Sequence, residues 1–271
     1  MPTVKTNGIE IYYETRGTGT PLLLINGWGG NLNSWSDEMV DSLAEHHQVI
    51  MMDNRGTGRS SKPYEPYTID MMAADAAGLL EAIGVEHAHV MGFSMGGVIT
   101  QAFGLNYPEK TLSLVLCGTQ PGGLHRISSD PAVQMDLALI ANPLPEMTER
   151  DRTVKLLYLL YSADYVEANL EALIEDETYS DNPTPDYALM RQSGAIAGFD
   201  SYDRLPEMVF PVLVMVGLDD VLVPPGNSEI LAERIPNAEL VRLPGCGHGF
   251  LKQKTGEAVA HILGFLALVD G

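Results

Sequence analysis

Short apolar runs alternate with longer amphipathic stretches along the first half of the chain. Compact apolar runs predict strands, and apolar positions at helical spacing predict helices between them. A chain that alternates these elements is expected to form a mostly parallel sheet with helices on both faces. The expected strands are residues 9–13, 21–26, 49–53, 88–93 and 111–117, and the expected helices are residues 34–45, 69–83 and 95–106.

Helical periodicity replaces the β pattern between about residues 121 and 206. The helices expected there are residues 131–141, 149–161, 165–175 and 185–197, and most of their Tyr, Leu and Met side chains are expected to form a small core of their own. The β pattern then returns, with strands at residues 211–216 and 238–243 and helices at 228–235 and 255–268. The sequence therefore predicts an α/β core of residues 1–120 and 207–271 with an inserted helical cap of residues 121–206.

The charge balance narrows the choice of partners. The chain has 36 acidic and 16 basic residues, which gives a formal net charge of −20. A negative potential repels phosphate backbones and anionic membrane surfaces, so we expect neither nucleic acid nor a membrane as partner. We expect the charge to form a solvated surface, the partner to be a small molecule, and the chain to act as a monomer or homodimer.

Residues 1–8 show no basic segment followed by an apolar stretch, and no apolar run approaches the roughly 20 residues that cross a bilayer. These features favour a cytoplasmic protein. The two cysteines, Cys117 and Cys246, lie far apart and show no disulfide framework spacing. We therefore expect no disulfide-based fold, and either cysteine could serve as a buried apolar side chain.

A Gly-x-Ser-x-Gly pattern, Gly92-Phe93-Ser94-Met95-Gly96, lies between an expected strand and an expected helix. The bare pattern is weak, since a glycine-rich turn also explains it. The context strengthens it, because a sharp turn that presents a serine hydroxyl needs neighbours without side chains, and Gly92, Gly96 and Gly97 meet this need. Ser94 is therefore a candidate nucleophile, and the amide of Met95 at the helix start is a candidate oxyanion donor.

A serine nucleophile needs a base, and histidine has a suitable pKa. Among the seven histidines, His248 lies in a glycine-rich loop after the last expected strand, where its ring can reach the carboxyl edge of the sheet. The acid is expected after residues 211–216, where Asp219 and Asp220 compete. Either aspartate could instead serve as a turn or capping residue. The order serine, acid, histidine favours His248 as the base.

These segments together resemble the serine-nucleophile branch of the α/β-hydrolase superfamily over nearly the whole chain. Residues 24–28 occupy the place of the His-Gly oxyanion segment, residues 53–60 match an Asp-x-Arg-Gly-x-Gly-x-Ser turn, and residues 92–97 match the nucleophile elbow. Residues 217–224 match Gly-x-x-Asp-x-x-x-Pro, which assigns the acid to Asp220 rather than Asp219. Asn26 stands where many members have histidine, a change similar to the branch of esterases and 3-oxoadipate enol-lactonases.

The resemblance implies an α/β-hydrolase fold and a role for each site residue. Ser94 would attack, His248 would carry the proton, and Asp220 would fix the tautomer of the imidazole. The backbone amides of Trp28 and Met95 would form the oxyanion hole, which Asn26 does not abolish because the donors belong to the backbone. No metal and no organic cofactor is implied.

The nucleophile also narrows the reaction. Related haloalkane dehalogenases and epoxide hydrolases use Asp at the elbow, so the serine of this chain indicates acyl transfer to water. We expect a carboxylic ester hydrolase for small to medium, partly hydrophobic substrates, since an apolar cap suits such groups. The alternatives are an enol-lactonase or other lactonase, a hydrolase of C–C bonds, and, from a different class, a ligand-binding receptor with a vestigial triad.

Overall fold

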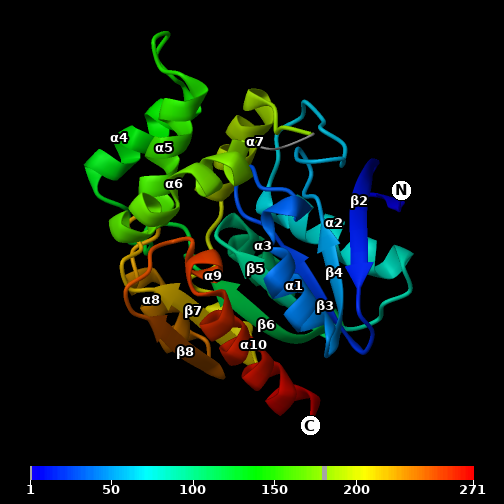
Figure 1. Ribbon diagram of the computed structural model, residues 1–271. Coiled ribbons are helices and arrows are strands. Elements are labelled where there is room, and N and C mark those ends of the chain that lie inside the picture. Colours follow the sequence, from blue (N-terminus) through cyan, green and yellow to red (C-terminus); the bar gives the residue numbers. More distant parts are fainter. Residues whose placement is uncertain (1, 179–181) are drawn as a thin grey trace.

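The computed structural model describes residues 2–178 and 182–271, which form an eight-stranded sheet flanked by helices (Figure 1). The strand order is β1-β2-β4-β3-β5-β6-β7-β8. The strands are β1 (Thr3–Thr6), β2 (Ile9–Arg16), β3 (Thr20–Ile25), β4 (His47–Met52), β5 (Ala88–Phe93), β6 (Thr111–Cys117), β7 (Val212–Gly217) and β8 (Ala238–Leu243).

Six neighbouring strands from β4 to β8 pair in parallel, and β2 joins β1 and β4 in antiparallel fashion. The central strands β5, β6 and β7 are almost fully buried, which explains their continuous apolar runs. The expected mostly parallel sheet is thus confirmed. Strand β1 was not expected, because its four residues alternate between exposed and half-buried positions and carry no apolar run.

The helices form two layers around this sheet (Figure 1). Helices α1 (Asp37–Ala44), α9 (Phe250–Gln253) and α10 (Thr255–Asp270) bury one apolar cluster against one face. Helices α2 (Ile69–Ala82), α3 (Met95–Asn106) and α8 (Gly226–Arg234) bury a second cluster against the other face. The chain therefore forms an α/β sandwich in which helices cover both faces of the sheet.

Capping side chains define where several helices begin. Helix α1 starts at Asp37, later than expected, because the Ser36 side chain accepts a hydrogen bond from the amide of Met39. Thr68 caps α2 in the same way. Helix α3 and strands β5 and β6 have the bounds that the sequence predicts.

A helical insertion lies over the carboxyl ends of the strands (Figure 1). It contains α4 (Pro131–Ala141), α5 (Glu149–Leu160), α6 (Ala163–Thr178) and α7 (Asp186–Ala197). Leu157 and Tyr161 are buried in an apolar cluster within this insertion, as expected for a cap with its own core. Met135 and Met190, by contrast, are 63% and 61% exposed. The boundaries of the cap at residues 121 and 206 stay a prediction.

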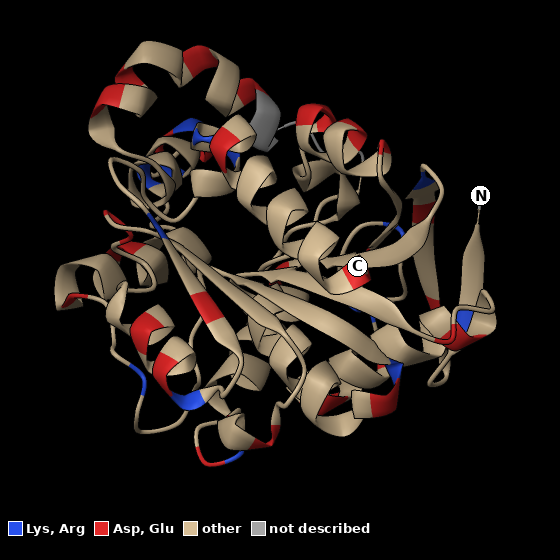
Figure 2. Ribbon diagram, turned by 90° about the horizontal axis from the view of Figure 1, so that it is seen from below, with Lys and Arg blue, Asp and Glu red and all other residues tan. Residues whose placement is uncertain are grey.

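The acidic residues are spread over the helices and loops on all sides of the view in Figure 2. Among the described residues, no helix combines the length and the apolar character needed to cross a membrane. Cys117 and Cys246 are both free and buried, as expected. Burial raises the pKa of the Cys246 thiol to about 11 and also raises that of Cys117, so both thiols stay protonated near neutral pH.

Residues 53–60 form a buried turn that holds several loops together. The Asp53 carboxylate accepts hydrogen bonds from the amides of Leu32 (2.8 Å) and Arg59 (2.7 Å). Arg55 donates two hydrogen bonds to Asp75 on α2, at 2.6 and 2.7 Å. Both partners of this ion pair are buried, and Asp75 is the acidic partner of the Arg55 guanidinium, although Asp75 Oδ1 also accepts a hydrogen bond from Asn7 Nδ2 (3.0 Å).

The Arg55–Asp75 pair generates a stability prediction. Asp75→Ala should lower the free energy of unfolding by about 3 to 5 kcal/mol, because it leaves a buried guanidinium without its partner. Asp37→Ala is the control, since it removes a surface partner of Arg16 and should cost less than about 1 kcal/mol. Urea unfolding curves measure both values. Equal losses in the two variants would contradict the prediction.

Candidate active site

Strands β3 and β5 lie side by side, but the chain leaves them toward opposite sides of the sheet, to β4 and to β6. Ligands of α/β proteins bind at the carboxyl edge where the strand order reverses in this way. Trp28 follows β3 and Ser94 follows β5, so both lie at this edge. The two loops touch: a Cβ built on Gly27 would lie 3.2 Å from the Cβ of Ser94.

Ser94 occupies a strained turn between β5 and α3. Its φ of 55° and ψ of −117° lie outside the ordinary regions for a residue with a side chain, at a cost of about 1 to 3 kcal/mol. Its backbone amide donates to the carbonyl of Cys117 (2.8 Å), and its carbonyl accepts from Thr119 Oγ1 (2.8 Å). The surrounding structure thus stabilises a conformation that the isolated turn would avoid.

Glycines permit the close packing of this turn. A Cβ at Gly92 would overlap the carbonyl of Gly96, and a Cβ at Gly96 would overlap the carbonyl of Ile25 at the end of β3. Helix α3 can therefore begin directly against β3. Met95 is its first residue, and the first amides of a helix have no intrahelical acceptor. Its N–H and the positive end of the helix dipole suit a developing oxyanion.

Asp220 and His248 meet after β7 and β8. His248 Nδ1 donates a hydrogen bond of 2.7 Å to Asp220 Oδ2, and the His248 residue is 3% exposed. Asp220 Oδ1 accepts from the amides of Leu222 (2.9 Å) and Val223 (2.8 Å). Because the carboxylate accepts at both oxygens, it orients the imidazole with its proton on Nδ1, which leaves the Nε2 lone pair for a substrate or nucleophile. Asp219 is exposed and makes no side-chain contact of this kind among the described residues.

The elbow and the histidine loop are neighbours. The Phe93 ring lies 4.9 Å from the His248 ring between centroids, and both rings border Gly118. Among the described residues, Ser94 Oγ and His248 Nε2 form no hydrogen bond. Such bonds are often long in enzymes without substrate and shorten when the substrate binds. The structure thus joins Asp220 to His248 and packs the residue before Ser94 against the imidazole.

Two of the other histidines lie at the opposite, amino end of the parallel strands. His47 and His89 are buried near the starts of β4 and β5. His125 stacks on Tyr202 with ring centroids 3.5 Å apart.

Asn26 shapes the loop after β3. Its Nδ2 donates to the carbonyl of Asn31 (2.6 Å), and its Oδ1 accepts from the amide of Gly27 (2.9 Å). Asn54 Nδ2 donates to the Asn26 carbonyl (3.0 Å). Asn26 thereby folds residues 26–31, which include Trp28, into a tight loop at the end of β3.

Helix α7 holds this same loop from above, a contact that the sequence did not indicate. Gln192 Oε1 accepts from the amide of Gly29 (2.8 Å), and its Nε2 donates to the carbonyl of Arg55 (3.2 Å). Trp28 Nε1 donates to the carbonyl of Leu189 on α7 (2.9 Å). Gln192 is fully buried. The only feature of the sequence that could have indicated this contact is that Gln192 is a polar residue on the buried face of an expected helix.

The end of α5 covers the histidine loop. The amide of Gly249 donates to the carbonyl of Leu160 (2.7 Å), and a Cβ at Gly249 would overlap the Tyr161 ring. The glycines on each side of His248 therefore let the insertion pack directly on this loop. The insertion therefore contacts the candidate site at two places, the loop of residues 26–31 and the loop that carries His248.

Comparisons with known proteins agree with this geometry. Residues 20–255 match the family described as the alpha/beta hydrolase fold. A protein of Azorhizobium caulinodans named "Putative carbamate hydrolase RutD" is 32% identical over 274 residues, with all of both chains covered. A protein of Caulobacter with the same name is 33% identical over 95% of this chain and 96% of its own.

Solved structures show the same fold. An enol-lactonase from Burkholderia xenovorans LB400 is 25% identical with a TM-score of 0.84, over 98% of this chain and 100% of its own. A thermophilic esterase from Thermogutta terrifontis is 27% identical with a TM-score of 0.82, over 98% of this chain and 97% of its own. The described sheet and its helical insertion are those of the α/β-hydrolase fold. The chain therefore belongs to the α/β-hydrolase family and is a hydrolase of that family.

Proposed function

We propose that this chain is a serine hydrolase that cleaves carboxylic esters of small to medium, partly hydrophobic substrates through an acyl-enzyme on Ser94. The observation that carries the proposal is the buried hydrogen bond between His248 Nδ1 and Asp220 Oδ2, at 2.7 Å, beside the strained turn of Ser94. An oriented imidazole that can reach a serine hydroxyl is the arrangement that turns a weak nucleophile into a reactive one.

In the first half of the reaction, Ser94 Oγ attacks the ester carbonyl carbon while His248 Nε2 takes its proton. The carbonyl oxygen becomes an oxyanion, which accepts hydrogen bonds from the amides of Met95 and Trp28. Asp220 stabilises the imidazolium that forms. The alcohol then leaves with the proton from His248, and the acyl group stays on Ser94.

In the second half, a water molecule attacks the acyl carbon and gives a proton to His248. The same amides stabilise the second oxyanion, and the acid product leaves as Ser94 regains its proton. The insertion supports both halves, since α7 positions the loop of Trp28 and α5 covers the loop of His248. A cover of this kind excludes bulk water from the oxyanion, which strengthens its hydrogen bonds.

A carbamate is the second candidate substrate, because relatives about a third identical over the full chain carry the name carbamate hydrolase. A carbamate carbonyl has the same electrophilic carbon, with nitrogen on one side, so the same residues would act in the same order. Lactones form a third group, which the enol-lactonase neighbour represents. Rates for matched p-nitrophenyl esters, aryl carbamates and lactones of varied chain length separate these groups. Ester turnover well above the other two supports the proposal, and a preference for carbamate or lactone replaces it.

Ser94→Ala tests the nucleophile. It should lower kcat by several orders of magnitude, on the order of 10⁶-fold, while thermal unfolding stays unchanged, because triad members act as one unit. A fluorophosphonate probe should label the wild-type protein at Ser94 and leave the variant unlabelled. Folded wild-type protein that neither labels nor turns over substrate would favour a ligand-binding receptor.

Asp220→Asn tests the acid, with Asp219→Asn as its matched neighbour. The first change should lower kcat by about 10⁴-fold, because an amide that donates to Nδ1 selects the wrong tautomer of His248. The second should have little effect, since Asp219 is exposed. Steady-state kinetics on one ester give the ranking, and the reverse ranking would show that the acid is misassigned.

Gln192→Ala tests whether α7 positions the oxyanion loop. The variant should lower kcat by about 10-fold to 100-fold with a smaller change in KM, because a displaced amide at residue 28 affects the transition state most. Gln134→Ala, at an exposed glutamine of α4, is the control. A change in KM alone would mean that Gln192 shapes substrate binding rather than the oxyanion loop.

A further inference from the structure

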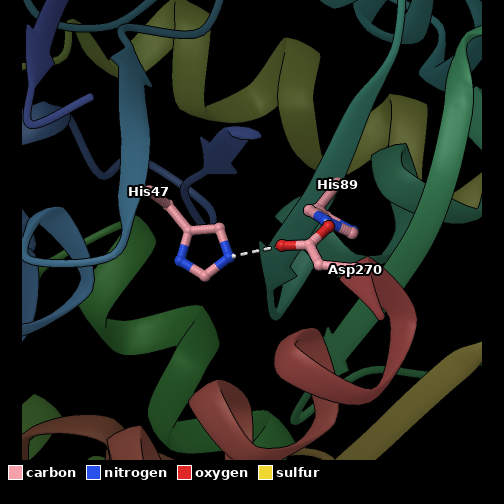
Figure 3. A group of neighbouring side chains, drawn as sticks. All are labelled: His47, His89 and Asp270. Atoms are coloured by element: carbon pink, nitrogen blue, oxygen red, sulfur yellow. Dashed lines mark hydrogen bonds and ion pairs between the residues drawn. The ribbon is translucent and has the colours of Figure 1, made fainter. Parts of the chain in front are cut away.

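Two histidines and an aspartate gather where α10 ends beside the sheet (Figure 3). His47 is the first residue of β4, His89 lies near the start of β5, and Asp270 is the last residue of α10. One nitrogen from each histidine and a carboxylate oxygen of Asp270 all lie within 4.8 Å of one another. These atoms are close enough to share one ion.

The sheet register explains why the two histidines face the same way. His47 pairs with Thr20 and His89 pairs with Leu22 on the strand between them. Residues two apart on a strand face the same side, so both imidazoles point to the α10 side of the sheet. This is the amino end of the parallel strands, whereas Ser94 follows the carboxyl end of β5. The cluster is therefore separate from the candidate active site.

His89 has the surroundings of a metal ligand. Its Nε2 lies 2.9 Å from Asp270 Oδ1, and its Nδ1 lies 2.7 Å from Ser113 Oγ. Histidines that bind metals use one ring nitrogen for the ion and donate from the other to an oxygen acceptor. Ser113 Oγ supplies that acceptor, so an ion bound to His89 Nε2 and Asp270 Oδ1 would take the place of the hydrogen bond between these two atoms.

His47 carries the second, independent observation. The residue is 4% exposed, and neither of its ring nitrogens has a hydrogen-bond partner, although Nε2 points at Asp270 Oδ2 from 3.4 Å. A buried imidazole without partners is costly, and such groups call for an explanation such as an ion. Figure 3 shows its ring directed toward the Asp270 carboxylate.

We propose that His47, His89 and Asp270 form a zinc-binding site that fixes the end of α10 to the starts of β4 and β5. Two imidazole nitrogens and one carboxylate oxygen are a donor set that suits Zn²⁺, with water as the fourth ligand. The ion gives His47 Nε2 a partner and links three segments that are distant in sequence. The site acts on stability and takes no part in the proposed ester cleavage.

The test uses the full chain without an affinity tag, after dialysis against a chelator. Isothermal titration calorimetry with ZnCl₂ should show one site per chain. The midpoint temperature of thermal unfolding should rise by several degrees in excess Zn²⁺. Because a net charge of −20 binds cations nonspecifically, the titrations are run in excess Mg²⁺ to occupy the acidic surface. Mg²⁺ prefers oxygen ligands and should not displace zinc from imidazoles.

Two variants assign the zinc to this cluster. Asp270→Asn keeps the size of a partly exposed side chain and should weaken zinc binding at least tenfold, whereas Asp41→Asn, at another exposed aspartate, should not. His47→Leu should abolish the zinc response and leave the zinc-free protein at least as stable as the wild type, because it removes an imidazole without partners. Ester hydrolysis should be unchanged in Asp270→Asn.

Three results would overturn the proposal. The first is a wild-type chain that binds no stoichiometric zinc in Mg²⁺. The second is zinc binding that survives in both Asp270→Asn and His47→Leu, which would place the ion elsewhere. The third is a clear loss of stability in zinc-free His47→Leu, which would mean that a charged His47 already pairs with Asp270.

Discussion

The close approach of β3, β5 and α3 is the constraint on which the candidate site depends. Ser94 adopts a φ of 55° because α3 starts against the carbonyl end of β3, a contact that only a residue without a side chain at position 96 permits. The same approach places the loop of Trp28 beside the serine. A single packing contact thus strains the proposed nucleophile, positions the first amide of α3 and brings the second proposed oxyanion donor near.

The helical insertion also acts as part of the site. Gln192 on α7 spans the amide of Gly29 and the carbonyl of Arg55, and Arg55 is itself tied to α2 through Asp75. The end of α5 packs on the loop that carries His248. Two loops that the proposed reaction needs in fixed positions are therefore held between the sheet and the insertion.

The two ends of the parallel sheet carry different chemistry. The carboxyl end presents loops and a helix start, which suit a reacting carbonyl group. The amino end brings the buried His47 and His89 together with the partly exposed Asp270, which joins α10 to the sheet. Both clusters pair imidazole with carboxylate. At the carboxyl end, Asp220 contacts Nδ1 of His248, which leaves Nε2 for the proposed proton transfer. At the amino end, Nδ1 of His89 is hydrogen-bonded to Ser113 Oγ.

The sequence by itself determined the alternation of strands and helices, the helical insertion, and the candidate residues Ser94 and His248, because periodicity and local glycine patterns act over short distances. The choice of Asp220 over Asp219 came from the resemblance to the α/β-hydrolase family. Only the tertiary structure joined Asp220 to His248, since their 28-residue separation leaves their contact to strand order. It also decided the partners of Gln192 and His47. The hydrogen bonds of Gln192, and their absence at His47, depend on which side chains of different helices and strands come into contact. No local sequence pattern encodes those contacts.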